Sequence, residues 1–283
     1  MSAAAHRSLA FPAPAKLNLM LRVVGRRPDG FHLLQTVFRL LDFGDDVRLC
    51  VRDDGAIQRI RDVPGVAAED DLSVRAARLL QRATGTHLGA DIELEKRIPV
   101  GGGLGGGSSD AATTLLALNH LWKTGLTRAA LLELAAQLGA DVPVFVFGEN
   151  AWGEGIGEKL TPIALPPCWY VVLTPDVMIP TARIFLHPDL KRDSEITKIQ
   201  AFLVGTPVND LQAVVCREYP EVARYLAWLG QHGRAMMTGS GASVFAAYET
   251  EDEARAVLAG VQEDMRGFVA RGLQRHPLHD LAS

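Results

Sequence analysis

The amino-acid sequence predicts an α+β fold, on three grounds. The first hundred of its 283 residues are rich in strand patterns, and the rest mixes helices with further strands. The two kinds of element do not follow the regular strand–helix–strand order that predicts a doubly wound parallel sheet. Hydrophobic residues make up 48% of the chain and charged residues 22%, a globular balance that excludes disorder, collagen and coiled coil.

Strands are predicted first near the N-terminus. Residues 17–24 form an apolar run that ends at the strong turn signal Arg-Pro-Asp-Gly at 27–30. Residues 36–41 and 47–51 are two further strand candidates. The segment 42–46 between them contains three Asp and one Gly, and it predicts a hairpin connection.

The next part of the chain predicts helices around one more strand. Residues 72–80 place their apolar side chains at helical spacing. Residues 91–95 alternate strictly, so we expect a half-buried strand with one wet face. A helix follows at 108–122, and Thr127 is expected to cap another helix over 128–138.

The proline-rich segment 162–167 has neither a helical nor a strand period, and it is the predicted domain boundary. We therefore expect an N-terminal domain over residues 1–163 and a C-terminal domain over residues 164–283. In the second domain the patterns predict strands at 169–173, 244–248 and 268–270, and helices at 211–217, 222–229 and 251–259.

The strongest functional signal is a run of six glycines in seven positions, residues 101–107, directly ahead of Ser108, Ser109 and Asp110. Glycine lets backbone amides approach a polyanion with no Cβ in the way. The loop leads into a helix whose first amides and positive dipole end also favour a phosphate. A flexible linker is the alternative, but this loop is held between a strand and a helix. The pattern indicates a phosphate-binding loop.

The loop does not match the common nucleotide motifs. Gly101, Gly103 and Gly106 fit the dinucleotide fingerprint in form, but no Asp or Glu occurs over residues 111–132, where the ribose-binding acid would follow. No Lys follows the glycines as in a Walker A motif, and the chain has no His-Arg-Asp of a protein kinase. A nucleotide phosphate loop of another family remains.

Polar residues at three other places have two interpretations each. Lys16, near Asn18 in the first apolar strand, is either an outward side chain of an edge strand or a point charge for a phosphate or an activated oxygen. Asp141 is a helix cap, a group facing a cleft, or both. The turn at 239–243 is a plain turn or a second wall of the phosphate site.

Composition and spacing also argue against several classes of protein. The three widely spaced cysteines disfavour a disulfide scaffold and a zinc site, and the pair His276 and His279 is expected in a solvated tail. A net charge of −4 and 6% aromatic residues disfavour nucleic-acid binding. No signal-peptide run and no apolar run of 18 residues occurs, so we expect a cytoplasmic protein with no membrane contact and no obligate protein partner.

Five sequence blocks occur in an order that carries a resemblance: Pro-Ala-Lys-Leu-Asn-Leu at 14–19, Arg-Pro-Asp-Gly-Phe-His at 27–32, the glycine loop at 99–109, Gly-Ala-Asp-Val-Pro at 139–143, and Thr-Gly-Ser-Gly-Ala-Ser at 238–243. With them the chain resembles a small-molecule kinase of the GHMP superfamily, over about residues 11–248. The glycine loop alone gives the superfamily. The Lys-Leu-Asn, Asp-Gly-Phe-His and Ala-Asp-Val-Pro blocks are similar to its branch that acts on a diphosphocytidyl substrate.

The resemblance implies a fold and a reaction. The N-terminal domain would be like ribosomal protein S5 domain 2, and the C-terminal domain ferredoxin-like, with ATP between them. The γ-phosphoryl group of ATP, with Mg²⁺ on the phosphates, would pass to the 2-hydroxyl of the methylerythritol unit, in the non-mevalonate isoprenoid pathway. The nucleotide phosphates would lie on Pro99, Val100, Gly101, Gly102, Gly103, Leu104, Gly105, Gly106, Gly107, Ser108 and Ser109.

The same resemblance implies residue roles. Lys16 and Asp141 would be the catalytic pair: Asp141 would accept the substrate hydroxyl proton, while Lys16 would stabilise the developing alkoxide and the transferring group. The substrate pocket would be lined by Asn18, Phe31, His32, Thr181 and Phe185.

Two positions depart from the family pattern. Phe31 stands where the family usually has Tyr, which keeps a ring for stacking on cytosine and removes the hydroxyl. Asp71 stands where the family usually has Asn, which changes the side chain expected near adenine. Another GHMP kinase, such as a homoserine or mevalonate kinase, and a non-catalytic nucleotide-binding regulator are the alternative functions.

Overall fold

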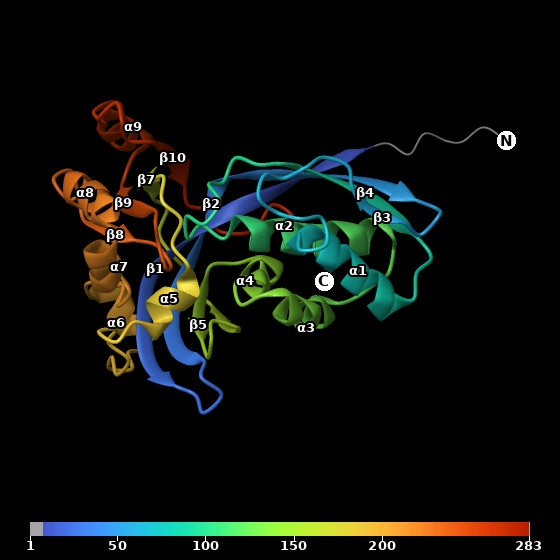
Figure 1. The fold of residues 1–283 in the computed structure, drawn as a ribbon, viewed down its shortest axis with the longest axis horizontal. Helices are drawn as coiled ribbons and strands as arrows, with labels where there is room; N and C mark the ends of the chain where they lie inside the picture. The colour runs from blue at the N-terminus through green and yellow to red at the C-terminus, as the bar shows by residue number, and fades with distance from the viewer. Residues whose placement is uncertain (1–7, 283) are drawn as a thin grey trace.

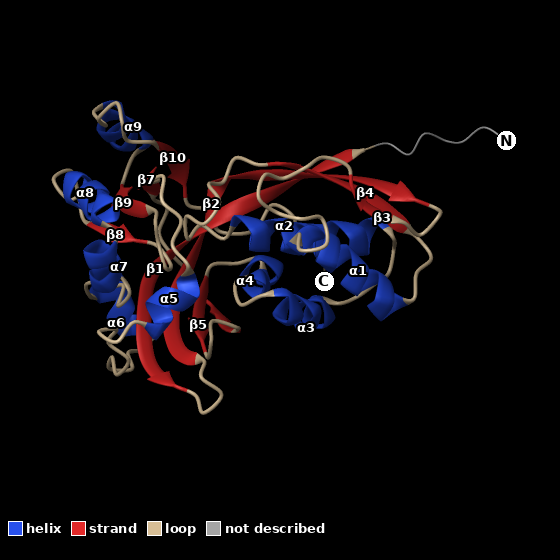
Figure 2. Ribbon diagram, in the orientation of Figure 1, coloured by secondary structure: helices blue, strands red, loops and turns tan. Residues whose placement is uncertain are grey.

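The computed structural model describes residues 8–282. In this part of the chain the elements form two sheets, each covered by helices on one face (Figures 1 and 2). The first sheet has the order β3-β4-β2-β5-β6, with β1 paired to β2, and the second has the order β10-β7-β9-β8. Because most neighbouring strands are antiparallel and helices do not alternate with them, the predicted α+β class is confirmed.

Two long antiparallel strands, β1 (Leu9–Arg26) and β2 (His32–Arg52), form the spine of the molecule. The predicted turn between them is confirmed, and it closes with a hydrogen bond of 3.0 Å from the Gly30 amide to the Arg27 carbonyl. Gly30 has a φ of 93°, a conformation that favours glycine. Figure 1 shows both strands spanning the two halves of the molecule, in opposite directions.

The predicted hairpin at 42–46 is wrong, because β2 continues through it and pairs there with β1 and with β4 (Gly89–Glu95). Gly44 is needed inside the strand: a Cβ on it would overlap the carbonyl oxygen of Ala13 on β1. Asp45 is fully buried. The polar residues that indicate a turn locally are therefore used for a close strand contact and a buried charge.

Helices cover one face of the first sheet. Thr127 caps α3 as predicted, by accepting a hydrogen bond of 3.3 Å from the Ala130 amide. The helices and remaining strands of this half are β3 (Ile57–Arg59), α1 (Leu72–Thr84), α2 (Gly106–Leu121), α3 (Arg128–Leu138), α4 (Val142–Phe147), β5 (Ala151–Glu154) and β6 (Lys159–Pro162).

The second sheet also has one helix-covered face, formed mainly by α7, α8 and α9. The strands and helices predicted for this half all occur, with ends that differ by a few residues. The elements are β7 (Trp169–Leu173), α5 (Thr181–Leu186), α6 (Ile199–Val204), α7 (Gln212–Glu218), α8 (Pro220–Leu229), β8 (Ala235–Met237), β9 (Val244–Tyr248), α9 (Glu251–Ala259), β10 (Gly267–Arg271) and the short 3₁₀ helix His279–Leu281.

The proline-rich segment 162–167 carries the chain from one sheet to the other. At both ends, however, the chain crosses this division: Leu21 and Val23 of β1 lie in the core of the second half, whereas Leu278 and Ala282 lie in the core of the first. The expected solvated tail at 276–279 is wrong, because His276 is 2% exposed and its amide donates to the Gly148 carbonyl.

The other face of the second sheet packs on the spine. Leu17 of β1 and Leu41 of β2 form an apolar seam with Tyr170, Val172 and Phe245 of the second sheet. The seam holds the two halves together, and the functional site lies beside it. No helix of residues 8–282 is long and apolar enough to cross a membrane.

Candidate active site

A cavity of about 660 Å³ collects residues from distant parts of the chain. Its walls come from β1, the turn before β2, the glycine loop, the start of α4, α5 and the turn at 239–243. Seven residues of the predicted catalytic pair and substrate pocket line it: Lys16, Asn18, Phe31, His32, Asp141, Thr181 and Phe185. From the predicted nucleotide-binding loop, Gly101, Gly103 and Ser108 line the cavity.

Lys16 and Asp141 form an ion pair in this cavity. The distance from Lys16 Nζ to Asp141 Oδ2 is 3.2 Å; the lysine side chain is 2% exposed and the aspartate side chain 39%. The alternative of an outward lysine on an edge strand is therefore wrong. Asp141 stands at the N-cap of α4, but within the described chain its side chain caps no amide and points to Lys16 instead.

Asn18 is fixed by a chain of hydrogen bonds. Its Oδ1 accepts from Lys16 Nζ at 2.6 Å, and its Nδ2 donates to Thr36 Oγ1 at 2.8 Å. The Thr36 hydroxyl in turn donates to the Met20 carbonyl at 2.6 Å. Since every member is buried, the lysine and the amide are held in one orientation.

The glycines of the loop allow close contact with the second glycine turn. A Cβ on Gly103 would lie 2.5 Å from the Thr238 carbonyl oxygen and 2.9 Å from the Gly241 carbonyl oxygen. A Cβ on Gly105 would lie 3.1 Å from Lys16 Cε. Both glycines have a φ of 75°. The turn at 239–243 thus packs on the loop, and Gly239 and Ser240 line the same cavity, as expected for a second wall.

The first turn of α2 continues the loop as predicted. Ser108 lines the cavity, whereas Ser109 is fully buried and donates its hydroxyl to the Pro14 carbonyl at 2.7 Å. In the described chain no side chain caps this helix start. Its first amides and the positive end of the helix dipole are therefore available to an anion.

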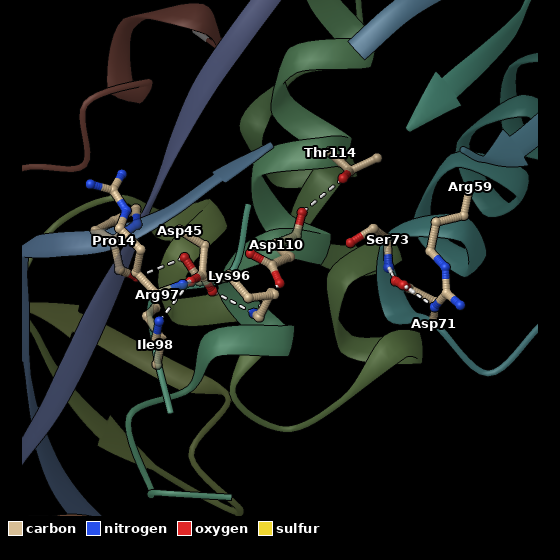
Figure 3. A network of polar contacts seen from close by, with 11 residues as sticks. Pro14, Asp45, Arg59, Asp71, Ser73, Lys96, Arg97, Ile98, Asp110 and Thr114 are labelled. Atoms are coloured by element: carbon tan, nitrogen blue, oxygen red, sulfur yellow. Dashed lines mark hydrogen bonds and ion pairs between the residues drawn. The ribbon is translucent and has the colours of Figure 1, made fainter. Parts of the chain in front are cut away.

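A buried ionic network supports the loop from behind (Figure 3). Lys96 bonds to the carboxylates of Asp45 on β2 and of Asp110 on α2, the latter at 2.5 Å. Asp45 also accepts from the Ile98 amide at 2.7 Å. Burial raises the pKa of Asp110 to about 7, against the opposing effect of Lys96. The network joins strand, loop entrance and helix start.

Asp71, the second departure from the family pattern, has a structural role in the described chain. Its carboxylate caps α1 through the Ser73 amide at 2.9 Å and bonds to Arg59 Nη1 at 2.9 Å (Figure 3). It is 5% exposed. An Asn here would keep the cap and lose the charge on the arginine contact.

Rings and hydroxyls form the other end of the cavity. Phe31 is 58% exposed, so it does not pack in the core. His32 lies beside Phe185, with ring centroids 5.1 Å apart. Thr181 shares a hydrogen bond of 2.7 Å with Ser240 of the second glycine turn. The aromatic end and the glycine end thus belong to one continuous site with the ion pair among its walls.

Sequence reasoning missed several of the supporting residues. Thr36 and Asp45 lie in or beside strands that were recognised, but their partners are far away in sequence. Lys96, and Arg192 behind His32, carry no local signal of their contacts. Ser240 was included only as part of a glycine turn.

Within residues 8–282 no cluster of three or more His, Cys, Asp or Glu side chains could hold a metal ion. Oxygen-bearing side chains do line the cavity, among them Ser108 with its hydroxyl and Asp141 with its carboxylate. Such donors suit Mg²⁺, which keeps few protein ligands when it is shared with phosphates.

Comparison with known proteins agrees with this geometry. The family described as GHMP kinases N terminal domain matches residues 71–149, and the family described as GHMP kinases C terminal matches residues 194–267. A 4-diphosphocytidyl-2-C-methyl-D-erythritol kinase of Nitrosospira multiformis is 62% identical over 97% of this chain and 94% of its own. The same-named protein of Thiobacillus denitrificans is 61% identical over 96% and 98%.

Solved structures show the same relationship. A crystal structure of 4-(cytidine 5'-diphospho)-2C-methyl-D-erythritol kinase matches with a TM-score of 0.80 and 34% identity, over 93% of this chain and 99% of that one. A mevalonate kinase, with a TM-score of 0.70 and 15% identity over 94% and 100%, shares the fold alone. The chain therefore belongs to the 4-diphosphocytidyl-2-C-methyl-D-erythritol kinases of the GHMP kinase family.

Proposed function

We propose that this chain transfers the γ-phosphoryl group of ATP to the 2-hydroxyl of 4-diphosphocytidyl-2-C-methyl-D-erythritol, in the non-mevalonate isoprenoid pathway. The observation that supports this best is the Lys16–Asp141 pair in a cavity with a glycine loop at one end and aromatic rings at the other. ATP bound at the glycine loop and a cytosine-containing acceptor bound at the rings would bring their reacting groups together beside this ion pair.

The nucleotide phosphates would lie on the loop 99–109. The first amides of α2 and the Ser108 hydroxyl supply donors, and the helix dipole favours negative charge there. The geometry favours a different use for Ser109, since its buried hydroxyl ties the helix to β1. The network around Lys96 would keep the loop in place while ATP enters and ADP leaves.

Asp141 would accept the proton of the 2-hydroxyl as the oxygen attacks the γ-phosphorus. Phosphoryl transfer needs alignment and charge neutralisation more than covalent help, so the base contributes part of the rate acceleration. Lys16, held by Asn18, would place its positive charge beside the developing alkoxide and the transferring group. Mg²⁺, when bound with ATP, would neutralise the phosphate oxygens, and the Ser108 hydroxyl at the start of α2 is a candidate ligand for it.

The diphosphocytidyl end of the acceptor would occupy the aromatic part of the cavity. Phe31 offers an exposed ring for stacking on cytosine, while His32 and Phe185 form the facing wall. Thr181 and Asn18 would contact the middle of the substrate. We further propose the division into domains 1–163 and 164–283, and a cytoplasmic location.

A coupled ADP-release assay tests the function. The purified chain is given ATP, Mg²⁺ and one acceptor at a time: the diphosphocytidyl compound, mevalonate or homoserine. We expect turnover with the first and background with the others. Turnover of mevalonate or homoserine instead would assign another GHMP activity, and ATP binding with no turnover of any acceptor would favour a non-catalytic regulator.

A further inference from the structure

Arg192 bonds to His32, a residue of the cavity wall, but does not line the cavity itself. Its Nε donates to His32 Nε2 at 3.1 Å. The other two nitrogens of the guanidinium are also used: Nη1 donates to the Leu190 carbonyl at 3.0 Å, and Nη2 donates to the carbonyls of Phe185 and His187 at 2.9 and 2.8 Å. Arg192 is thus a rigid bracket between the end of α5 and the histidine.

This contact fixes the tautomer of His32. An arginine Nε always carries a hydrogen and can only donate, so His32 Nε2 must accept. In a neutral imidazole the remaining hydrogen is then on Nδ1. Burial, followed by the charges of Arg192 and Arg26, lowers the pKa of His32, which favours this neutral ring.

The Nδ1–H group is left for a ligand. Among residues 8–282 no protein group bonds to Nδ1, and the ring lines the cavity beside Phe185. His32 is 8% exposed, so bulk water competes little with a ligand for this N–H group. A planar base that stacks beside Phe185 would meet a donor of fixed direction.

We infer that Arg192 is a positioning residue that sets base specificity, by holding His32 as a hydrogen-bond donor toward the N3 position of the bound base. The inference rests on the proposed function and deepens it. Cytosine has an acceptor at N3, whereas uracil carries a hydrogen there. A fixed donor that faces another donor leaves both unpaired, and sites of this kind reject the wrong partner strongly. A histidine free to change tautomer would accept either base.

The kinetic test compares the diphosphocytidyl substrate with its diphosphouridyl analogue. In the wild type we expect kcat/KM to favour cytidyl by at least about a hundredfold. Arg192→Met should reduce this preference to less than about tenfold, through a higher KM for the cytidyl compound, with kcat at saturation changed little. Arg192→Lys keeps a cationic donor and should restore most of the preference. Lys191→Met removes the neighbouring exposed cation and should leave the preference unchanged.

A second measurement needs no turnover. The ¹⁵N chemical shifts of the His32 ring in the unliganded protein distinguish a protonated from an unprotonated nitrogen, with His32→Gln used for assignment. We expect the hydrogen on Nδ1 in the wild type and a mixture of tautomers in Arg192→Met. A wild-type ring with its hydrogen on Nε2 overturns the inference, even where the Met variant is too unstable to study.

A folded Arg192→Met variant that keeps the wild-type preference also overturns it. Failure of the proposed function looks different: the wild type would phosphorylate neither nucleotide compound. In that case the NMR measurement still decides the tautomer.

Discussion

Replacement of Asp141 by Asn isolates the charge of the proposed base. The variant keeps the shape of the side chain, and in the described chain Asp141 caps no amide that Asn would have to satisfy. Its carboxylate forms an ion pair with Lys16 at 3.2 Å, and the aspartate side chain is 39% exposed. Lys16 is buried, so its ammonium must keep acceptors; the amide oxygen of the Asn and Asn18 Oδ1 supply two, and we expect a loss of about 1 kcal/mol. For a chain of this size that corresponds to a shift in Tm of about 2–4 °C.

The expected loss of activity is much larger than this loss of stability. Without the carboxylate, the substrate hydroxyl has no base beside Lys16, and kcat should fall at least about a hundredfold. That factor corresponds to about 3 kcal/mol of transition-state stabilisation. ATP affinity should stay within about threefold of wild type, because the loop amides and the start of α2 are unchanged.

Three measurements and one control variant decide the matter: coupled ADP release for kcat, calorimetry for ATP affinity, and circular dichroism for the fold. Asp264→Asn breaks an exposed ion pair with Arg224 on the outside of the second half and should keep full activity. A folded Asp141→Asn variant with kcat within about threefold of wild type would refute the base assignment.

Three further predictions concern the two ends of the cavity and its support. Phe31→Ala should raise KM for the diphosphocytidyl substrate about ten- to a hundredfold, the scale of one stacked base, while Phe31→Tyr should be nearly neutral. Because the ring is 58% exposed, the Tm of Phe31→Ala should hardly move. An unchanged KM would place the cytosine contact elsewhere. Gly107→Val should weaken ATP binding by about tenfold or more in calorimetry with little change in Tm, since the nearest atom to its new Cβ outside its own helical turn is Leu72 Cδ1 at 3.9 Å. Full affinity would show that the first turn of α2 does not hold phosphate. The pKa of Asp110, raised to about 7, predicts that the native state retains a proton that the unfolded state loses near pH 4. Stability from this group is therefore present at low pH and lost as pH rises through 7. In urea unfolding the wild type should lose about 1 kcal/mol of unfolding free energy between pH 6 and 8, and Asp110→Asn should not show this loss. A wild type that gains stability over this interval, relative to the variant, contradicts the assignment.

Local patterns predicted the elements whose cause is local. The helix over α3 follows from its apolar spacing and from the Thr127 cap, and the strand β4 follows from strict alternation. The hairpin predicted for segment 42–46 was wrong because the contacts that determine its structure are distant in sequence: Asp45 is the partner of Lys96, and Gly44 makes room for β1. The same holds for His276, whose burial depends on contacts with Gly148.

The candidate site shows the same limit. From the residues alone, Lys16 had two equal interpretations, and the choice between them depends on an aspartate in another element 3.2 Å away. The resemblance to known kinases brought the two together in advance. Arg192 had no such help, because its contact with His32 joins two segments by long-range packing and leaves no pattern in either.

The glycine loop is the case in which one pattern has two physical causes. From the sequence, Gly103→Val is expected to weaken ATP binding while Tm moves less, since the glycines are attributed to phosphate contact. The structure revises this expectation: a Cβ on Gly103 would lie 2.5 Å from the Thr238 carbonyl oxygen at a φ of 75°, so the substitution would also disturb the packing of the two glycine turns. Gly107 is the position where the two causes separate, because its Cβ would make only an ordinary van der Waals contact, with Leu72 Cδ1 at 3.9 Å. A loss of ATP affinity at Gly107 without a loss of Tm would therefore be evidence for phosphate binding that the same loss at Gly103 could not give.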